Sequence, residues 1–452
     1  MDEINYYTDN INECLKGYIT FGDATLFAEL TINDKSISIR VFDFDNITSG
    51  NGTDFITVKS FIFQKSFNYY LLFGLELNGM SSIRTSDNNQ FSDFLFSAQG
   101  FLHSRSRLSL NDLFRSISIY GDGIKKWSGN TRKLNNMLEH GISNILPNDE
   151  DCIEFEKYIP DIGNIGLYYS YRFGGLKGLY TAGIDIEPYI MLSFERAIKL
   201  DEVIEQYIDL YMLLRFLIGD SLSISNIKVR RKNDGNSIQL YLAEKKGGNT
   251  SINTGMLLPY SSIFRDDSEN SFHHSLWLNY YNTTDNHLKE LIKKYITYTM
   301  IHDTEEQFLG FYRIIETMTL RTSCYVDKDK LDNLLKRSRK ILSKIFPGPS
   351  LRDFIRAIKR ANKSQHNTES CIRHFIHSLP KSIIQLFRLD EIEINDICSS
   401  RNKIIHQPLF TETPERLYKH LIRTETLVKL ALLTRLDIPT DKIENIRINH
   451  LW

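Results

Sequence analysis

The sequence predicts an α+β protein of more than one domain, in which a β-rich domain is followed by an all-helical domain. The first observation is length, because 452 residues exceed what a single hydrophobic core usually holds. The other two are apolar periods: about two residues in the first part of the chain and about 3.6 residues in the last part. With 41% hydrophobic and 25% charged residues, the chain has the composition of folded globular domains.

Residues 1–285 alternate between apolar and polar side chains, as half-buried strands do. The run SISIRV (36–41) is one example. Similar runs, rich in β-branched and aromatic residues, occur at 18–45, 55–77, 114–123, 166–173, 189–195, 223–232 and 237–245. A helix interrupts them at 200–219 and ends at Gly219. We therefore expect a sandwich-like β domain with one inserted helix over residues 1–285.

Residues 286–452 instead repeat their apolar side chains at helical spacing. Helices are predicted at 287–300, 303–320, 329–346, 350–361, 369–379, 390–407 and 413–437. Asp303 and Thr413 are typical N-caps, and Pro414 suits the first helical position. We place the domain boundary in the polar stretch NTTDN, residues 282–286.

Charge, hydropathy and cysteine usage exclude several classes of protein. The formal net charge is −1, so the chain is not a uniformly basic nucleic-acid binder. We find no uncharged apolar run long enough for a membrane span and no signal-peptide pattern at the N-terminus. The five cysteines are scattered without a C-x-x-C pair, which favours reduced thiols over disulfides or a zinc site. The sequence therefore predicts a cytoplasmic protein with no membrane partner, no metal site and no cofactor.

Arg401 lies in an unusual place on the predicted helix 390–407. It shares a stripe with Ile397 and Ile405, where a guanidinium is costly unless a partner or an open cleft receives it. Asn402 and His406 lie one turn apart on the adjacent stripe. This arrangement favours a functional site at the end of the helix.

An ordinary structural role remains open for Arg401 and His406. Arg and His near a helix C-terminus often serve the last carbonyls and the helix dipole. Spacing alone also has little value, since Arg360 and His366 form a second pair of the same kind. That second pair flanks a polar stretch typical of a helix end and a surface loop.

The motif RNKIIH (401–406), in the penultimate helix of a helical C-terminal domain, resembles the Arg-Asn-x-x-x-His signature of HEPN domains, a family of metal-independent ribonucleases. The stretch FLGFYRIIETM (308–318) resembles the HEPN helix that supplies an acidic residue, here Glu316. The order of the two halves, with the stretches 15–42 and 189–219 in the first, resembles ApeA-type anti-phage defence proteins. The resemblance implies an all-α HEPN bundle over 286–452 and a homodimer whose two motifs face each other across a cleft.

The residue types fit RNA cleavage without a metal. RNA carries its own nucleophile, the 2′-OH, so the protein needs a proton donor or acceptor near neutral pH and a positive charge for the developing phosphorane. His406 suits the first task and Arg401 the second. Asn402 would orient the imidazole or hold a phosphate oxygen, and Glu316 would fix Arg401 or the histidine tautomer. These four residues are the predicted catalytic set.

The expected partner is RNA, with tRNA among the candidates. Lys and Arg concentrate in residues 328–363, and we expect Arg337, Arg339 and Lys403 to contact the RNA backbone. A solvated basic helix face is the open alternative for this cluster. A phage-derived trigger is expected to act through the β-rich domain. The rival function is a non-catalytic scaffold that binds RNA or a protein through an inactive helical domain.

Overall fold

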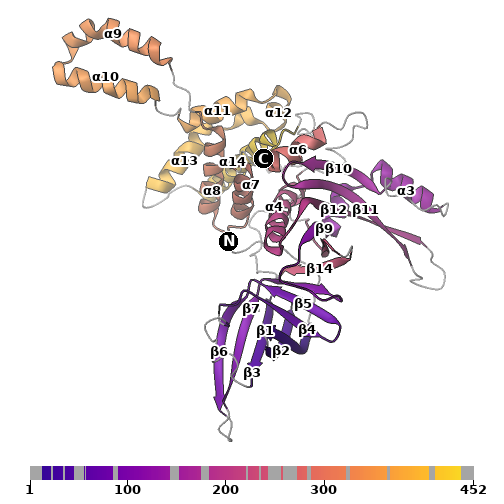
Figure 1. The fold of residues 1–452 in the computed structure, drawn as a ribbon. Helices are drawn as coiled ribbons and strands as arrows, with labels where there is room; N and C mark the ends of the chain where they lie inside the picture. Colours follow the sequence, from indigo (N-terminus) through magenta and orange to yellow (C-terminus); the bar gives the residue numbers. More distant parts are fainter. Residues whose placement is uncertain are drawn as a thin grey trace. The chain divides into compact units, whose positions relative to one another are not determined.

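The fold is taken from a computed structural model of the full chain (Figure 1). It describes residues 13–21, 24–33, 36–44, 55, 57–84, 90–142, 152–174, 183–219, 222–233, 236–242, 256–257, 272–281, 287–321, 326–363, 367–406 and 413–438. The chain divides into two compact units, with the main boundary between Met300 and Ile301. The first unit is β-rich and the second is helical, which confirms the predicted α+β class.

The first unit is built on one antiparallel sheet. Across the described residues its fourteen strands follow the order β10-β11-β12-β9-β13-β14-β8-β5-β4-β1-β2-β3-β7-β6. Their bounds are β1 Glu13–Phe21, β2 Ala24–Asn33, β3 Ser36–Asp43, β4 Ser60–Lys65, β5 Asn68–Phe73, β6 Glu76–Arg84, β7 Gln90–Ala98, β8 Gly100–Ser104, β9 Phe114–Tyr120, β10 Ile153–Ile159, β11 Gly163–Gly174, β12 Gly183–Ile198, β13 Asn226–Arg231 and β14 Ser237–Leu242.

Burial along these strands alternates as the sequence period predicts. In β2 and β3 every second side chain is buried, including Leu30, Ile39 and Val41 at 0% exposure. The buried side chains of β1–β5, β7 and β8 meet in one apolar core, to which Phe55 adds an aromatic ring. Hydrophobic burial on this face fixes the strand register, because a slip of one residue would turn the apolar set to solvent.

The β-rich unit has its described strands hydrogen-bonded into a single continuous sheet, which curves so that the rings of Phe61 (β4) and Phe96 (β7) meet in one core, 5.3 Å apart. It also holds more helices than the one predicted: α2 Asp122–Ser128, α3 Arg132–Ile142, α4 Leu200–Ile218, α6 Phe272–Tyr281 and α7 His287–Thr299. The short α2 and α3 follow β9 and pack against β12, a contact that only the folded sheet creates.

The boundary after Met300 differs from the one expected after residue 285, because α7 packs within the β-rich unit. Its apolar stripe, which includes Leu291 and Ile292, is buried. Lys289 Nζ pairs with Asp209 Oδ2 of α4 at 2.6 Å. The rings of Tyr295 and Phe216 lie 5.5 Å apart, edge to face. The helix α7, although its apolar side chains repeat every 3.6 residues, therefore belongs to the β-rich unit. The stretch NTTDN (282–286), where the boundary was expected, lies outside the described residues.

The second unit is helical throughout its described residues. Its elements are α8 Thr304–Thr319, α9 Lys328–Ile345, α10 Gly348–Lys363, α11 Thr368–Ser378, α12 Lys381–Leu386, a 3-10 turn at Leu389–Glu391, α13 Ile394–His406 and α14 Pro414–Arg435. The predicted caps form: Asp303 accepts a hydrogen bond from the Glu306 N–H, and Thr413 accepts one from the Arg416 N–H. The helix α14 is buried along most of its length and packs against α8.

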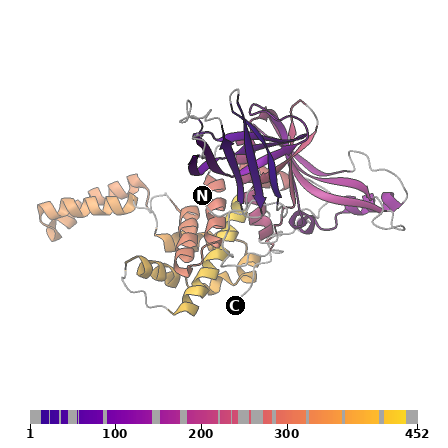
Figure 2. The ribbon, with the colours of Figure 1, turned by 90° about the horizontal axis from the view of Figure 1, so that it is seen from below.

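The helices α9 and α10 pack against each other as a hairpin and lie side by side in Figure 1, whereas in Figure 2 they overlap. The rings of Phe346 and Phe354 stack at 4.5 Å near the turn between them. At the other end, Asn362 donates to the Val326 carbonyl and accepts from its N–H, at 2.8 and 2.9 Å. These contacts close the hairpin at both ends of its seam.

Candidate functional site

The candidate site is built around the C-terminal half of α13. This helix buries Ile394, Ile397 and Ser400 on one face. Arg401 follows Ser400 and is only partly buried, so it lies at the edge of that face. Its Nη1 donates to Asn402 Oδ1 at 3.0 Å, and its guanidinium carbon lies 5.6 Å from the centroid of the Tyr312 ring. Among the described residues no carboxylate forms an ion pair with Arg401.

The Tyr312 ring of α8 lies against the Arg401 guanidinium and presents its electron-rich face to it, a cation–π contact. Its hydroxyl donates to Cys398 Sγ at 3.3 Å. Burial, followed by the nearby Cys398, raises the pKa of Tyr312 well above its ordinary value. Burial likewise raises the pKa of the Cys398 thiol. Both groups are therefore neutral near pH 7, and Arg401 rests on an uncharged aromatic platform.

Glu316 lies one helical turn after Tyr312 on α8, on the same side of the helix. Its Oε1 accepts a hydrogen bond of 2.7 Å from the hydroxyl of Thr368, the first residue of α11. Glu316 is among the causes that raise the pKa of Tyr312 and of Cys398, which places its carboxylate in the same neighbourhood. The structure thus brings Glu316 to the Tyr312 cluster, but it joins Glu316 to Thr368 rather than to Arg401 or His406.

His406 is the last residue of α13 and is exposed. Asn402, one turn earlier, is exposed too, and Ile405 beside it is 44% exposed. No side chain in the described part of the chain hydrogen-bonds to the His406 imidazole. The helix therefore presents Asn402, Ile405 and His406 together to its surroundings, next to the half-buried Arg401.

The geometry of α13 is held by polar contacts with α14. Ser400 and His420 are both buried, and Ser400 Oγ lies 3.0 Å from His420 Nδ1. Near the start of the helix, Asp396 Oδ2 pairs with Arg416 Nη2 at 2.7 Å. The pKa of the Asp396 carboxyl lies below its usual range, because it has a hydrogen-bond partner in Glu393 and a cation in Arg416. These two contacts orient the helix that carries the RNKIIH residues.

The predicted RNA-contacting residues lie on two elements. Arg337 and Arg339 are exposed on α9, whereas Lys403 is partly buried on α13. Between α9 and α10 lies a hollow of about 420 Å³ lined by Lys328, Arg356, Lys359 and Arg360, with Asp332 as the one acidic group among its described lining residues. Lys359 donates to Asp332 at 2.8 Å and holds the pKa of that carboxyl below its usual range. Of the second Arg–His pair, Arg360 borders this hollow, and His366 lies outside the described residues.

Sequence reasoning missed three members of the cluster: Tyr312, Thr368 and Cys398. The spacing of Tyr312 and Glu316 by four residues on one helix was a usable signal. So was the spacing of Cys398 and Arg401 by three residues on α13. No sequence pattern pointed to Thr368, because its contact with Glu316 arises from the packing of α11 on α8.

Metal ligands and membrane-spanning helices are both missing from the described part of the chain. Its residues include no group of three or more His, Cys, Asp or Glu side chains arranged to hold a metal ion. None of the helices described is both long and apolar enough to cross a membrane.

A family model, ApeA N-terminal domain 1, matches residues 14–295. No curated protein and no solved structure is matched by this chain. The match covers more than half of the sequence and extends from the start of β1 into α7, so it takes in nearly all of the β-rich unit. The chain therefore belongs to the ApeA family.

Proposed function

We propose that this protein is a metal-independent endoribonuclease of the HEPN class that acts as an effector in anti-phage defence. Membership of the ApeA family supports the defence role. The observation that carries the nuclease proposal is the end of α13, where Arg401, Asn402 and His406 lie on adjoining, accessible faces. Arg401 rests on the neutral Tyr312 ring with no carboxylate partner among the described residues, so its charge remains available for a phosphate.

In the proposed reaction the 2′-OH of RNA attacks its own phosphate. His406 takes the proton from the 2′-OH or gives one to the leaving 5′ oxygen, and Arg401 stabilises the charge of the pentacoordinate phosphorane. Asn402, hydrogen-bonded to Arg401, holds the guanidinium fork in place. Glu316 acts at a distance through the Tyr312 cluster, so its expected role is positioning. The products are a 2′,3′-cyclic phosphate and a 5′-hydroxyl.

The test is cleavage of total RNA by the purified full-length protein in the presence of EDTA, with chemical analysis of the product ends. Arg401→Ala and His406→Ala should each lower the rate on the order of 10²-fold or more. Matched controls are Arg313→Ala and His377→Ala, which remove exposed side chains of the same type from α8 and α11. A 5′-phosphate product, or full activity in the His406 variant, would refute the mechanism.

We propose that the active form is a homodimer in which the two α13 ends face each other. The support is local: Ile405 is 44% exposed beside His406, whose imidazole has no hydrogen-bond partner in the described residues. An Ile405→Cys variant, with the exposed Cys14 replaced by Ser, should form a disulfide-linked dimer. Leu386→Cys, at a similar exposure of 43% on α12, should not. A protein that is monomeric by light scattering at micromolar concentration and still cleaves RNA would exclude the composite site.

RNA binding without cleavage is the second candidate function. The segment 326–363, which forms the α9–α10 hairpin, holds twelve Lys and Arg against four Asp and Glu, a net charge of +8 in a chain of net charge −1. Such a surface attracts nucleic acid whether or not a catalytic site is active. Expression in phage-infected cells separates the two functions. Protection that survives in both Arg401→Ala and His406→Ala favours the binding function, and its loss in both favours the nuclease.

A further inference from the structure

A polar pocket on the β-rich unit is lined by none of the residues of the candidate nuclease site. It has a volume of about 700 Å³ and lies where β8, β13 and β14 run side by side. Its floor and walls include Arg105, Lys228, Asn236, Ser237 and Gln239. No Asp or Glu is among the described residues that line it. A pocket of this size falls in the range of small-molecule sites, which run from roughly 300 to 1,000 Å³.

The sheet register aligns the floor of the pocket. Lys228 of β13 is opposite Gln239 of β14, and Gln239 is opposite His103 of β8. Their sequence neighbours on these strands point to the other face and are buried: Leu102, Ile227, Val229, Ile238 and Leu240. Because side chains alternate along a strand, the three polar groups project together from one face of the sheet. The Tyr241 hydroxyl donates to Gln239 Oε1 at 2.8 Å and fixes that amide.

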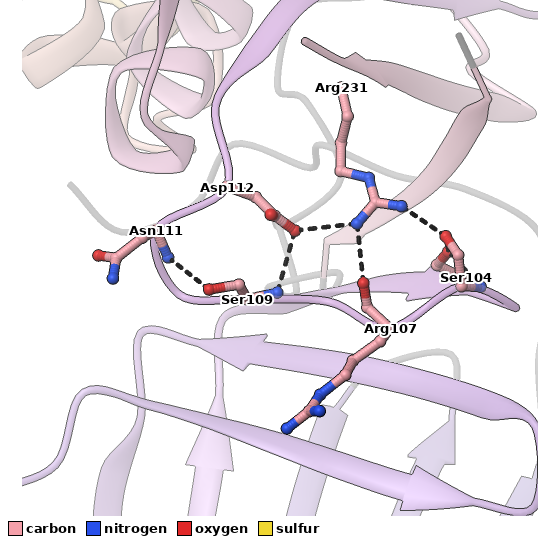
Figure 3. Close-up of polar contacts among 7 residues, drawn as sticks. Ser104, Arg107, Ser109, Asn111, Asp112 and Arg231 are labelled. Atoms are coloured by element: carbon pink, nitrogen blue, oxygen red, sulfur yellow. Dashed lines mark hydrogen bonds and ion pairs between the residues drawn. The ribbon is translucent and has the colours of Figure 1, made fainter. Parts of the chain in front are cut away.

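One wall of the pocket is the segment after β8 that contains Arg105 and Ser106, and hydrogen bonds from Arg231 hold this segment in place (Figure 3). The Arg231 guanidinium donates to the Arg107 carbonyl at 2.8 Å, to Ser106 Oγ at 2.5 Å and to Asp112 Oδ2 at 3.3 Å. The Arg231 side chain is only 12% exposed, so these bonds are shielded from water. Ser106 in turn is bonded to Ser104. The wall that carries Arg105 is therefore held in place without using Arg105 itself.

Three side chains that face the pocket, those of Arg105, Asn236 and Ser237, make no hydrogen bond or ion pair to any residue that the structure describes. The Lys228 ammonium lies 4.5 Å from the centroid of the Tyr120 ring, whose electron-rich face attracts the cation. The pocket thus offers two cations, a hydroxyl and an amide, with Asp112 already engaged by Arg231.

We propose that this pocket binds an anionic small molecule that carries a phosphate or diphosphate group. Arg105 and Lys228 balance the phosphate charge, and Asn236 and Ser237 donate hydrogen bonds to its oxygens. A phosphate group fits because it presents several acceptor oxygens around one centre, which matches donors that converge from different strands, and Arg provides a planar fork for two of them. This site shares no residue with the candidate nuclease site, since every residue involved lies in the β-rich unit.

Isothermal titration calorimetry of the full-length protein tests the proposal, with ADP and pyrophosphate as phosphate probes and adenosine as the uncharged comparator. ADP and pyrophosphate should bind and adenosine should not. Arg105→Gln and Lys228→Gln should each weaken binding about tenfold, equivalent to about 1.4 kcal/mol. Ser237→Glu, which places a carboxylate at the exposed start of β14, should abolish binding. Thermal unfolding checks that each variant stays folded.

Two controls decide whether binding belongs to this pocket. Arg196→Gln removes an arginine of the same unit whose side chain is 84% exposed, and it should leave binding unchanged. The double change Arg356→Gln/Arg360→Gln on the hairpin should leave it unchanged as well. The proposal is overturned if neither phosphate probe binds at millimolar concentration, or if the Arg105→Gln/Lys228→Gln double variant binds ADP as the unmodified protein does. Loss of binding in either control variant would also overturn it.

Discussion

Tyr312 lies on the apolar stripe of α8, as a core residue would, and yet it belongs to the candidate site around Arg401. It is 3% exposed, yet its ring carries Arg401 and its hydroxyl reaches Cys398. A buried aromatic ring that holds a charged group combines packing with electrostatics, since the attraction of a cation to a ring face is worth roughly 0.5 to 2 kcal/mol. The position of Arg401 is therefore expected to depend on the ring more than on the hydroxyl.

Two variants of Tyr312 should separate the ring from the hydroxyl. Tyr312→Phe keeps the ring and loses one hydrogen bond, so the free energy of unfolding should fall by about 1 kcal/mol and RNA cleavage should stay near that of the unmodified protein. Tyr312→Leu removes the ring beneath Arg401, and the single-turnover cleavage rate should fall about tenfold. Chemical denaturation and single-turnover kinetics measure the two effects. Equal cleavage rates in both variants would show that the ring does not position Arg401.

His103, which lines the polar pocket, should make the free energy of unfolding depend on pH. Burial lowers its pKa from the ordinary value of 6.5, despite opposing effects of Gln239 and Glu13; Arg105 lowers it further. A folded pKa below the unfolded value means that the unfolded chain binds more protons. The stabilising contribution is therefore present above pH 6.5 and is lost as the pH falls through the folded pKa.

The measurement is the NMR titration of the His103 ring, with denaturation curves at pH 7.5 and pH 5.5. The midpoint should lie below 6.5, and His103→Gln should show less loss of stability between these two pH values than the unmodified protein. His377, which is exposed on α11, provides the comparison: His377→Gln should follow the unmodified protein. A His103 midpoint above 6.5 would contradict the prediction.

At the scale of elements, the α9–α10 hairpin concentrates charge that the whole chain lacks. Its net charge is +8, and Arg356 and Arg360 flank a hollow of about 420 Å³. Arg337 and Arg339, which the sequence singled out, are exposed on α9 and are not among the residues that line this hollow. Phosphate contacts of a single strand each contribute about −0.7 to the slope of log K against log salt.

We therefore predict that Arg356→Gln/Arg360→Gln reduces the magnitude of this slope by about 1.4 for single-stranded RNA. Arg337→Gln/Arg339→Gln, which removes the same charge, should reduce it by less. Fluorescence anisotropy at several salt concentrations measures both. A larger effect of Arg337→Gln/Arg339→Gln would show that RNA binds along the exposed face of α9 instead.

At the scale of the whole molecule, the division after Met300 makes α7 part of the β-rich unit. Its contacts with α4 include the Lys289–Asp209 ion pair and the Tyr295–Phe216 ring contact. Five apolar side chains of α7 are at most 6% exposed: Leu288, Leu291, Ile292, Tyr295 and Ile296. Burying a side chain of this size stabilises a fold by about 1.5 kcal/mol or more.

A fragment of residues 1–300 should consequently be folded and soluble, whereas a fragment of residues 1–285 should unfold at a lower temperature or aggregate. Thermal unfolding and size-exclusion chromatography of the two fragments provide the measurement. The helical fragment 301–452 should retain its circular dichroism, because α8 packs against α11 and α14 within that unit. Equal thermal stability of 1–285 and 1–300 would place the boundary at residue 285 after all.

The sequence by itself determined the class of the fold and many of its local features. The period of two in β2 and β3, the period of about 3.6 in the helices, and the caps Asp303 and Thr413 all follow from short-range physical chemistry that a single segment contains. It also pointed to the RNKIIH stretch, because the residue pattern alone shows that an Arg on a stripe of isoleucines is anomalous.

Only the tertiary structure decided which segments meet. It joined the described strands into one continuous sheet, assigned α7 to that sheet's unit, and aligned Lys228, Gln239 and His103 across three strands. It also set Arg401 on Tyr312 and directed Glu316 to Thr368. The physical reason is that these contacts join residues far apart in the chain. Their free energy comes from burial and hydrogen bonds that exist only after the chain has closed the loops between them.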